Sequence, residues 1–274
     1  MTEFHKMQGL GNDFVVLDLR HQAFEINPEV ATRLADRRHG VGCDQILILR
    51  QPAEPHQQAS FEIWNSDGSQ AEQCGNGVRC LGLYLHMNGE TVDSRASLAG
   101  PADEIKIRCM ETGLVQVDMG EPDFDAQSIP VLAEQTNGFY HIEGPQGQLK
   151  LGAVSMGNPH ALLELTDLDN TDISQLGAGI SRHPKFPAGC NAGFAEIVNR
   201  DEVKLRVFER GAAETMACGS GACAAMVILR KAAKVNETVH VTQAGGVLII
   251  SWLGENEPVM MTGPAEYVYK GIFI

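Results

Sequence analysis

Two short stretches of the sequence have a pattern that suits proton transfer by cysteine. QCGNGVRC at 73–80 and ACGSGACA at 217–224 each place a cysteine before Gly-polar-Gly and an apolar run that is expected to be helical. A thiol at the start of a helix lies near the positive end of the helix dipole and near free backbone N–H groups, which favour the thiolate. Glycines there permit close backbone approach and unusual dihedral angles. Cys74 and Cys218 are therefore the candidate acid–base residues.

The backbone of the same two turns can hold an anion. N–H groups at a helix start bind a group such as a carboxylate, and Gly75-Asn76 and Gly219-Ser220 would supply them twice. One thiolate could remove an α-proton from one face of a carbon while the opposite thiol returns a proton to the other face. The charge that develops would spread onto the carboxylate held by the two helix starts. This pattern predicts stereoinversion without a redox step.

The other five cysteines have no such context. The seven cysteines of the chain include no C-x-x-C pair, so reduced thiols are expected and a structural metal is not. A single cysteine is most often a small buried hydrophobic residue. We expect that role for Cys43, Cys80, Cys109, Cys190 and Cys223.

Polar residues in short motifs that are rich in turn-forming residues are candidate ligand contacts. Four asparagines lie at matched or neighbouring positions of the two halves of the chain, although any one of them could be an ordinary turn residue: Asn12, Asn65, Asn158 and Asn191. Gln45 begins a predicted strand and could equally be a polar residue of an edge strand.

Charged residues close to the second turn extend the candidate site. Arg210 could clamp a carboxylate, and Glu209 could accept an ammonium group or bias the proton of the neighbouring thiol. The alternative is a solvated ion pair between these two residues. His160 could be a core histidine, or it could influence a thiolate through its own charge.

Three short sequence motifs recur in the same order in the two halves of the chain. GND at 11–13, GCDQ at 42–45 and CGNG at 74–77 match GNP at 157–159, GCNA at 189–192 and CGSG at 218–221. Asn12 to Cys74 is 74 − 12 = 62 residues, and Asn158 to Cys218 is 218 − 158 = 60 residues. The sequence therefore predicts two similar α/β halves, joined near 118–125. The helices after the two turns are apolar on nearly every face, which predicts strands curled around each helix and an active site in the groove between the halves.

Apolar and β-branched clusters between Gly, Pro and Asp define the expected elements. Strands are expected near 13–19, 45–50, 60–64, 104–109, 114–119, 160–165, 192–199, 203–209, 238–243 and 246–252. Helices are expected near 28–38, 76–88, 172–182 and 220–234, the first with Asn27 as its N-cap before Pro28.

Bulk properties restrict the class of partner. The chain has 274 residues, 43% of them hydrophobic, and a formal net charge of −14. This charge disfavours nucleic acid and anionic membranes, which select a basic face, and favours a small-molecule partner. No signal peptide or long apolar run is evident, so a cytoplasmic protein is expected.

Taken together, five stretches of the chain resemble the diaminopimelate epimerase family. They are MQGLGNDFVVLD (7–18), NSDGSQAEQCGNGVRC (65–80), SMGNPH (155–160), NAGF (191–194) and ERGAAETMACGSGACA (209–224). The resemblance implies a cofactor-independent epimerase that interconverts L,L- and meso-diaminopimelate, in the biosynthesis of lysine and of cell-wall precursor. It also implies two similar α/β domains, each with a curled, mostly antiparallel sheet around a central helix, at 1–118 with 264–274 and at 119–263.

The resemblance further implies a role for each candidate residue. Cys74 and Cys218 would be the acid–base pair, and Gly75, Asn76, Gly219 and Ser220 would hold the reacting carboxylate. His160 and Glu209 would tune thiol protonation. A homodimer with Tyr269 at its interface is implied as well. The remaining substrate-binding residues would be Asn12, Gln45, Asn65, Asn158, Asn191, Glu209 and Arg210.

Three other functions fit part of the pattern. A proline or hydroxyproline racemase-like enzyme would share the two-cysteine chemistry, but it would not need Arg210 and three asparagines to grip a second charged end. A thiol redox protein would use Cys74 and Cys218 as a disulfide-forming pair. An amino-acid-binding module without catalysis would leave the second cysteine unexplained.

Overall fold

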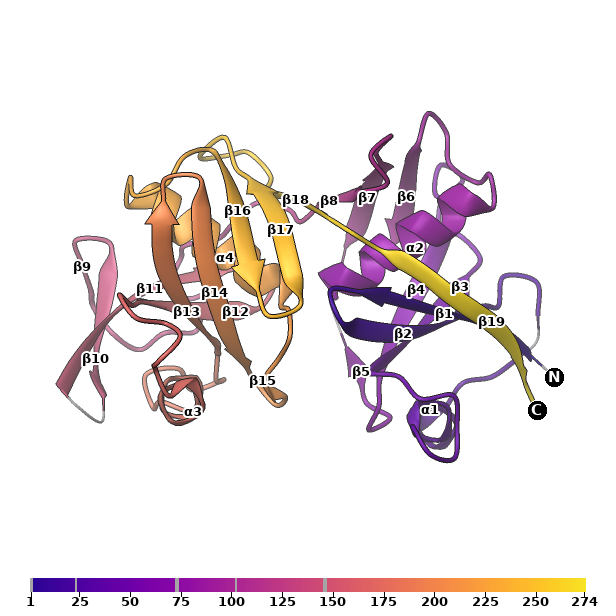
Figure 1. Ribbon diagram of the computed structural model, residues 1–274, viewed down its shortest axis with the longest axis horizontal. Helices are drawn as coiled ribbons and strands as arrows, with labels where there is room; N and C mark the ends of the chain where they lie inside the picture. The colour runs from indigo at the N-terminus through magenta and orange to yellow at the C-terminus, as the bar shows by residue number, and fades with distance from the viewer. Residues whose placement is uncertain (1, 23, 72–73, 102, 145–146) are drawn as a thin grey trace. The chain divides into compact units, whose positions relative to one another are not determined.

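Short apolar segments, buried either continuously or at alternate residues, make this a protein of β-strands with few helices (Figure 1). The computed structural model describes residues 2–22, 24–71, 74–101, 103–144 and 147–274. Two compact units are present. The N-terminal unit comprises Met1–Asp118 and Thr262–Ile274, and the C-terminal unit comprises Met119–Met261.

The N-terminal unit is a sheet of mixed direction with a buried helix. Its strands pair in the order β19–β1–β2–β3–β4–β6–β7–β8, and the β2/β3 and β4/β6 pairs are parallel. Its helices are α1 (Pro28–Ala35) and α2 (Gly75–Met87). Its strands are β1 (Thr2–Gly9), β2 (Asn12–Asp18), β3 (Gln45–Arg50), β4 (Ala59–Asn65), β5 (Gln70–Ala71), β6 (Arg95–Ala99), β7 (Glu104–Cys109), β8 (Val115–Asp118) and β19 (Glu266–Phe273).

The C-terminal unit repeats this topology. Its strands pair in the order β10–β11–β12–β13–β14–β16–β17, and the β12/β13 and β14/β16 pairs are parallel. Its helices are α3 (Ile173–Ser181) and α4 (Gly219–Lys231). Its strands are β9 (Gln135–Thr136), β10 (Phe139–Gly144), β11 (Gly147–Ser155), β12 (Pro159–Glu164), β13 (Asn191–Asn199), β14 (Glu202–Glu209), β15 (Ala213–Glu214), β16 (Thr238–Gln243) and β17 (Gly246–Ser251), and β18 (Met260–Gly263) crosses into the other unit and pairs with β8.

The two units therefore share one sequence of parallel and antiparallel pairings. α2 follows β4 and α4 follows β14, strands that hold the same place in the pairing orders of the two units, and both helices are buried over most of their length. α2 contacts β1, β2, β7, β8 and β19, and α4 contacts β11, β12, β13, β14, β16 and β17. The expected mixed α/β fold with two similar halves is confirmed, and the apolar faces of both helices are explained by strands on several sides.

Local sequence fixes the ends of the helices. Asn27 Oδ1 accepts a hydrogen bond from the backbone N–H of Val30 at 2.9 Å, and Pro28 is the first residue of α1, as expected. α4 ends earlier than expected because Ala233 takes a left-handed conformation with φ of 58°. None of the helices in the described ranges is long and apolar enough to cross a membrane.

Candidate active site

In the N-terminal unit, strand pairing collects the polar candidates at one edge of the sheet. β2 begins at Asn12 and β3 begins at Gln45, and these strands run parallel. β4 runs antiparallel to β3 and ends at Asn65, which lies opposite Gln45. Gln45 Nε2 donates to Asn65 Oδ1 at 2.8 Å. The structure thus brings Gln45 and Asn65 together, and Gln45 is not a residue of an edge strand.

The tight turn between β1 and β2 sets the direction of Asn12. Leu10 and Gly11 both have positive φ, 57° and 82°, and Gly9 pairs with Asn12 across the turn. Two consecutive residues of positive φ match the right-handed twist of a two-residue hairpin. Leu10 takes this conformation at a steric cost of about 1 kcal/mol or more, since it has a Cβ atom. Asn12 is therefore held on a rigid hairpin.

Cys74 is the N-cap residue of α2 and lies beside two asparagines. Its Sγ donates to Asn12 Oδ1 at 3.7 Å, and Asn76 Nδ2 donates to the same oxygen at 3.3 Å. The Cys74 side chain is partly exposed, whereas Asn76 is buried. Cys74, Asn76 and Asn12 thus form one hydrogen-bonded group at the start of a buried helix.

In the C-terminal unit, the equivalent edge carries the other candidates. β12 and β13 run parallel, with His160 paired to Asn191, and β14 returns antiparallel to end at Glu209. Asn191 Oδ1 accepts the backbone N–H of Arg210 at 2.9 Å. Asn158 Oδ1 lies 2.9 Å from His160 Nε2, with that ring nitrogen as the donor. All of these residues come to the end of the sheet from which α4 begins.

Cys218, the N-cap residue of α4, is buried and held from several sides. Its backbone N–H donates to Gln243 Oε1 at 2.8 Å, and its Sγ accepts the Gly221 N–H at 3.4 Å. Ser220 Oγ lies 3.7 Å from the same sulfur. The first two N–H groups of the helix, at Gly219 and Ser220, have no acceptor within the helix, as at any helix start. They suit a carboxylate.

The protonation of Cys218 differs from the expectation. Burial raises its pKa well above that of an ordinary thiol, and the negative charge of Glu209 raises it further, while the Gly221 N–H and Ser220 act in the opposite direction. The prediction that the helix start favours a thiolate is wrong for this cysteine, because desolvation outweighs the N–H groups. Cys218 is therefore a thiol at neutral pH, with Glu209 as the acceptor of its S–H hydrogen bond.

The role expected of His160 also changes. Burial lowers its pKa to about 3, and the positive charge of Arg210 acts in the same direction. The imidazole is neutral at physiological pH, so the prediction that it acts through its own charge is wrong. Its ring can act only as a neutral hydrogen-bonding group, as in its contact with Asn158.

The glycines of the two turns serve close packing. Gly75, Gly77, Gly219 and Gly221 are helical and do not have positive φ, so the expected unusual dihedral angles are absent from these four positions. A Cβ atom on Gly77 would lie 2.9 Å from Leu47, and one on Gly221 would lie 2.9 Å from Val207 and 3.2 Å from the Cys218 sulfur.

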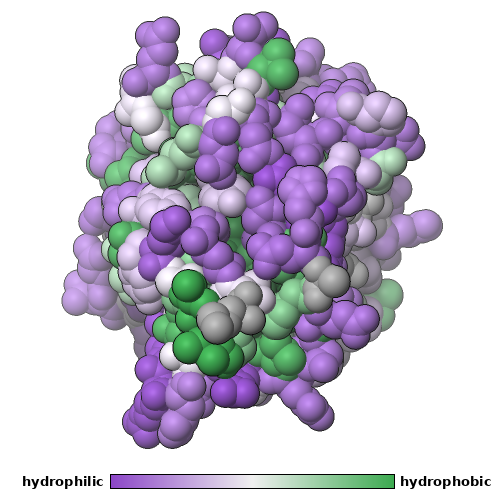
Figure 2. Space-filling view, turned by 90° about the vertical axis from the view of Figure 1, so that its right-hand side faces the viewer, coloured by the Kyte–Doolittle hydropathy of each residue, from purple (hydrophilic) through white to green (hydrophobic). Residues whose placement is uncertain are grey.

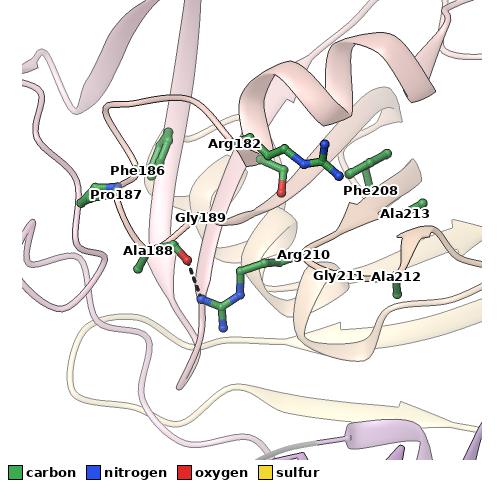
Figure 3. Close-up of a pocket in the computed structure, with 11 residues that line it drawn as sticks. Arg182, Phe186, Pro187, Ala188, Gly189, Phe208, Arg210, Gly211, Ala212 and Ala213 are labelled. Atoms are coloured by element: carbon green, nitrogen blue, oxygen red, sulfur yellow. Dashed lines mark hydrogen bonds between the residues drawn. The ribbon is translucent and has the colours of Figure 1, made fainter. Parts of the chain in front are cut away.

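Arg210 is exposed and free of a carboxylate partner among the described residues. Its Nη1 donates to the Ala188 carbonyl at 2.9 Å, and no ion pair joins it to Glu209 within the described part of the chain (Figure 3). The alternative of a solvated Glu209–Arg210 pair is therefore wrong. Arg210 lines a cavity of about 590 Å³, and Arg182 lies on the same cavity. None of the other candidate residues lines it.

The remaining cysteines are structural, as expected. Cys43, Cys80, Cys109, Cys190 and Cys223 are all buried. Burial raises the pKa of Cys43, Cys80 and Cys190 to about 12 each.

Sequence reasoning missed several residues that contact the candidates, among them Asp44, Thr215 and Gln243. Asp44 accepts from Asn12, Thr215 Oγ1 donates to Glu209 Oε1 at 2.5 Å, and Gln243 caps the Cys218 peptide. Asp44 stands beside Gln45 in the repeated motif GCDQ, so a signal for it was present. Gln243 carries no local signal, since it reaches Cys218 from a strand that lies 25 residues further along the chain.

Known proteins resemble this chain in sequence and in fold. The family model described as diaminopimelate epimerase matches residues 4–124 and 152–268. A diaminopimelate epimerase of Thioalkalivibrio sulfidiphilus is 44% identical over 271 residues, which cover 98% of each chain. Solved structures share the fold at low identity. A probable proline racemase of Agrobacterium radiobacter K84 has a TM-score of 0.72 at 16% identity and covers 100% of this chain and 93% of its own. A hydroxyproline epimerase of Agrobacterium vitis has a TM-score of 0.71 at 16% identity, and the match covers 98% of this chain and 91% of that epimerase.

Proposed function

Because the chain belongs to the diaminopimelate epimerase family, we propose that it interconverts L,L- and meso-diaminopimelate by acid–base action of Cys74 and Cys218, without a cofactor. One observation carries the mechanism. In each unit, the equivalent strand, β4 or β14, is followed by a turn and by a buried helix with a cysteine at its N-cap. Equivalent thiols in duplicated units suit a reaction that inverts one carbon and runs in both directions.

Because Cys218 is protonated, it is the proton donor of the first turnover. Cys218 is the thiol that donates a proton, so Cys74 must first lose the S–H proton that it donates to Asn12 and then accept the α-proton as a thiolate. The C–H electron pair remains on the α-carbon, the carboxylate spreads the charge, and the carbon then takes the Cys218 proton on its other face. Cys74 ends as a thiol and Cys218 as a thiolate. These are the protonation states that the reverse reaction needs.

Substrate contacts follow from the residues that surround each thiol. Gly75 and Asn76, with Gly219 and Ser220, offer backbone N–H groups to the reacting carboxylate. Arg210, whose guanidinium bonds a backbone carbonyl and forms no ion pair within the described residues, offers its charge to the distal carboxylate. The family resemblance supports the same role at the distal amino-acid end for Asn65, Asn158, Asn191 and Glu209, and a substrate contact for Asn12 and Gln45. We further propose that the two units are the two epimerase domains.

The resemblance also supports a cytoplasmic homodimer in lysine biosynthesis. Exposed apolar side chains lie on the C-terminal strand, with Val268 at 55%, Tyr269 at 45% and Ile272 at 60% exposure. Figure 2 shows a mostly hydrophilic face of the protein on which hydrophobic residues gather in one area. Apolar groups at the edge of a charged surface are typical of a protein–protein contact. The ring of Tyr269 packs edge-on against that of Phe4, with 6.0 Å between the ring centroids, and this contact holds the Tyr269 ring in place.

The decisive experiment follows L,L-diaminopimelate by NMR in deuterated buffer with a reductant. We expect the meso isomer and α-deuterium to appear without added cofactor, and Cys74→Ala and Cys218→Ala each to lose at least about a thousandfold in rate. Cys109→Ala is the control, since Cys109 is a buried cysteine of β7 that contacts none of the candidate residues in the described part of the chain. Near-normal epimerisation by either alanine variant would exclude the two-thiol mechanism. Turnover of proline in place of diaminopimelate would favour the racemase alternative.

A further inference from the structure

We propose that Asp44 is a positioning residue that fixes the orientation of the Asn12 amide beside Cys74. The inference rests on the proposed function, in which Cys74 is the base. Asp44 does not touch the thiol. It stands at the start of β3, next to the start of β2, and it acts through Asn12.

The hydrogen bonds around Asn12 leave the amide one orientation. Asn12 Nδ2 donates to Asp44 Oδ2 at 3.0 Å, and the backbone N–H of Asp13 donates to the same oxygen at 3.1 Å. A carboxylate can only accept, so the NH₂ group of Asn12 must face Asp44. The amide oxygen is then directed to Cys74 Sγ, 3.7 Å away, and to Asn76 Nδ2, 3.3 Å away. Without Asp44, the Asn12 NH₂ group would lose its acceptor, and the weak bond from Asn76 Nδ2 would have to oppose a flip that presents NH₂ to the sulfur.

Asp44 is itself held rigidly. Arg37 Nη2 donates to Asp44 Oδ1 at 2.8 Å and to Asp13 Oδ1 at 2.6 Å. The Asp44 backbone N–H donates to Asp13 Oδ1 at 3.0 Å, and Lys6 Nζ donates to Asp13 Oδ2 at 2.5 Å. The carboxylate that orients Asn12 is thus fixed to both strand starts, and the positive charges of Lys6 and Arg37 balance the negative charges of Asp13 and Asp44.

The orientation matters to the reaction because Cys74 changes protonation. An oxygen next to the sulfur accepts the S–H group and stabilises the thiol that forms when Cys74 takes the α-proton. An NH₂ group in that place would stabilise the thiolate and weaken the base. By keeping the oxygen toward the sulfur, Asp44 keeps Cys74 basic at no cost of reorientation during the reaction.

Two substitutions separate orientation from charge. Asp44→Ala removes the acceptor, and we expect kcat to fall about tenfold with less than a threefold change in KM. Asp44→Asn loses the negative charge and the bond from Arg37, but its amide oxygen can still accept from Asn12 and Asp13. We expect Asp44→Asn to keep at least about half of the wild-type kcat. Arg37→Met, which leaves both bonds to Asp44 Oδ2 in place, is expected to behave likewise.

A double-mutant cycle tests whether Asp44 acts through Asn12. In the Asn12→Ala background, Asp44→Ala should cost less than twofold further, because the amide that it orients is gone. Equal losses in Asp44→Ala and Asp44→Asn, or losses that multiply in the double variant, would overturn the proposal. If Asp44→Ala does not fold, loss of activity in a folded Asp44→Asn or Arg37→Met variant would also overturn the proposal. A wild-type protein that does not epimerise diaminopimelate would instead count against the proposed function itself.

Discussion

The two candidate thiols share a backbone setting and differ in their side-chain partners. Glu209 stands 218 − 209 = 9 residues before Cys218, and Asn65 stands 74 − 65 = 9 residues before Cys74, each as the last residue of an equivalent strand. One position thus carries a carboxylate in the C-terminal unit and an amide in the N-terminal unit. Charge next to a thiol shifts its proton equilibrium far more than an amide does. The N-terminal unit therefore lacks, at this position, the charge that raises the pKa of Cys218 in the C-terminal unit.

Replacing Glu209 by Gln should make Cys218 more reactive as a nucleophile. An uncharged amide no longer raises the pKa of the thiol, so the thiolate fraction at about pH 9 should rise several-fold. The measurement is the rate of Cys218 alkylation by iodoacetamide in a Cys74→Ser background, mapped by mass spectrometry. Glu214→Gln, whose carboxylate pairs with Arg206, is the matched control. An unchanged rate in Glu209→Gln would mean that burial alone keeps Cys218 protonated.

His160 should make the folded state sensitive to acid. Its folded pKa is lowered to about 3, whereas in the unfolded chain it is about 6.5. Between these values the unfolded chain binds a proton that the folded chain does not, so the free energy of unfolding falls as the pH falls, by at most about 1.4 kcal/mol per pH unit. Urea unfolding at about pH 7 and pH 5.5 should show this slope, and it should be smaller in His160→Gln. Equal slopes would contradict a neutral buried imidazole.

At the scale of elements, strands with regular burial and helices with clear end signals were predictable. The ranges 45–50, 104–109 and 238–243 coincide with β3, β7 and β16, because apolar residues cluster there between turn residues. The sequence reasoning missed several strands, among them β6, β10, β11 and the terminal pair β1 and β19. β1 contains His5 and Lys6, both buried, and its partner β19 lies at the other end of the chain, with Thr2 opposite Phe273. Such pairing leaves no local signal.

The same limit applies to the site. Cys74 and Cys218 were identifiable because a glycine turn, a helix start and a repeated position coincide in a few residues. The partners Asp44 and Gln243 come from neighbouring strands, and their contacts depend on the parallel β2/β3 register and on the end of β16. Protonation was not predictable either, because desolvation depends on the tertiary packing around Cys218 and His160.

Two glycines of α3 should respond oppositely to the same substitution. A Cβ atom on Gly177 would lie 2.4 Å from Phe208, the residue before Glu209, whereas one on Gly179 would meet nothing within 4 Å. Gly177→Ala should therefore lower the free energy of unfolding by about 1–3 kcal/mol and displace the end of β14. Gly179→Ala should raise it by about 0.5–1 kcal/mol, since alanine favours a helix. Urea denaturation of both variants measures the difference. Equal effects would show that α3 does not pack closely on β14.

At the scale of the whole molecule, the C-terminal strand ties the last residues of the chain to the first. β19 pairs with β1 along its length, and buried Arg79 of α2 donates through Nε to the Pro264 carbonyl at 3.1 Å, just before β19. The N-terminal unit is thus completed only after the whole C-terminal unit has been synthesised. The strand that closes this unit also carries the exposed apolar side chains attributed to the dimer.

The proposed dimer must overcome charge repulsion, since each chain carries a formal net charge of −14. Screening should weaken that repulsion, so we expect the dimer of 29.7 kDa chains to be more stable at about 0.5 M than at about 0.05 M salt. Ile272→Asp places a charge among the apolar residues of β19 and should produce monomers in light scattering after gel filtration. Val198→Asp, at a similarly exposed position of β13 in the other unit, should remain dimeric. A monomeric wild type, or dissociation of both variants alike, would exclude β19 as the contact surface.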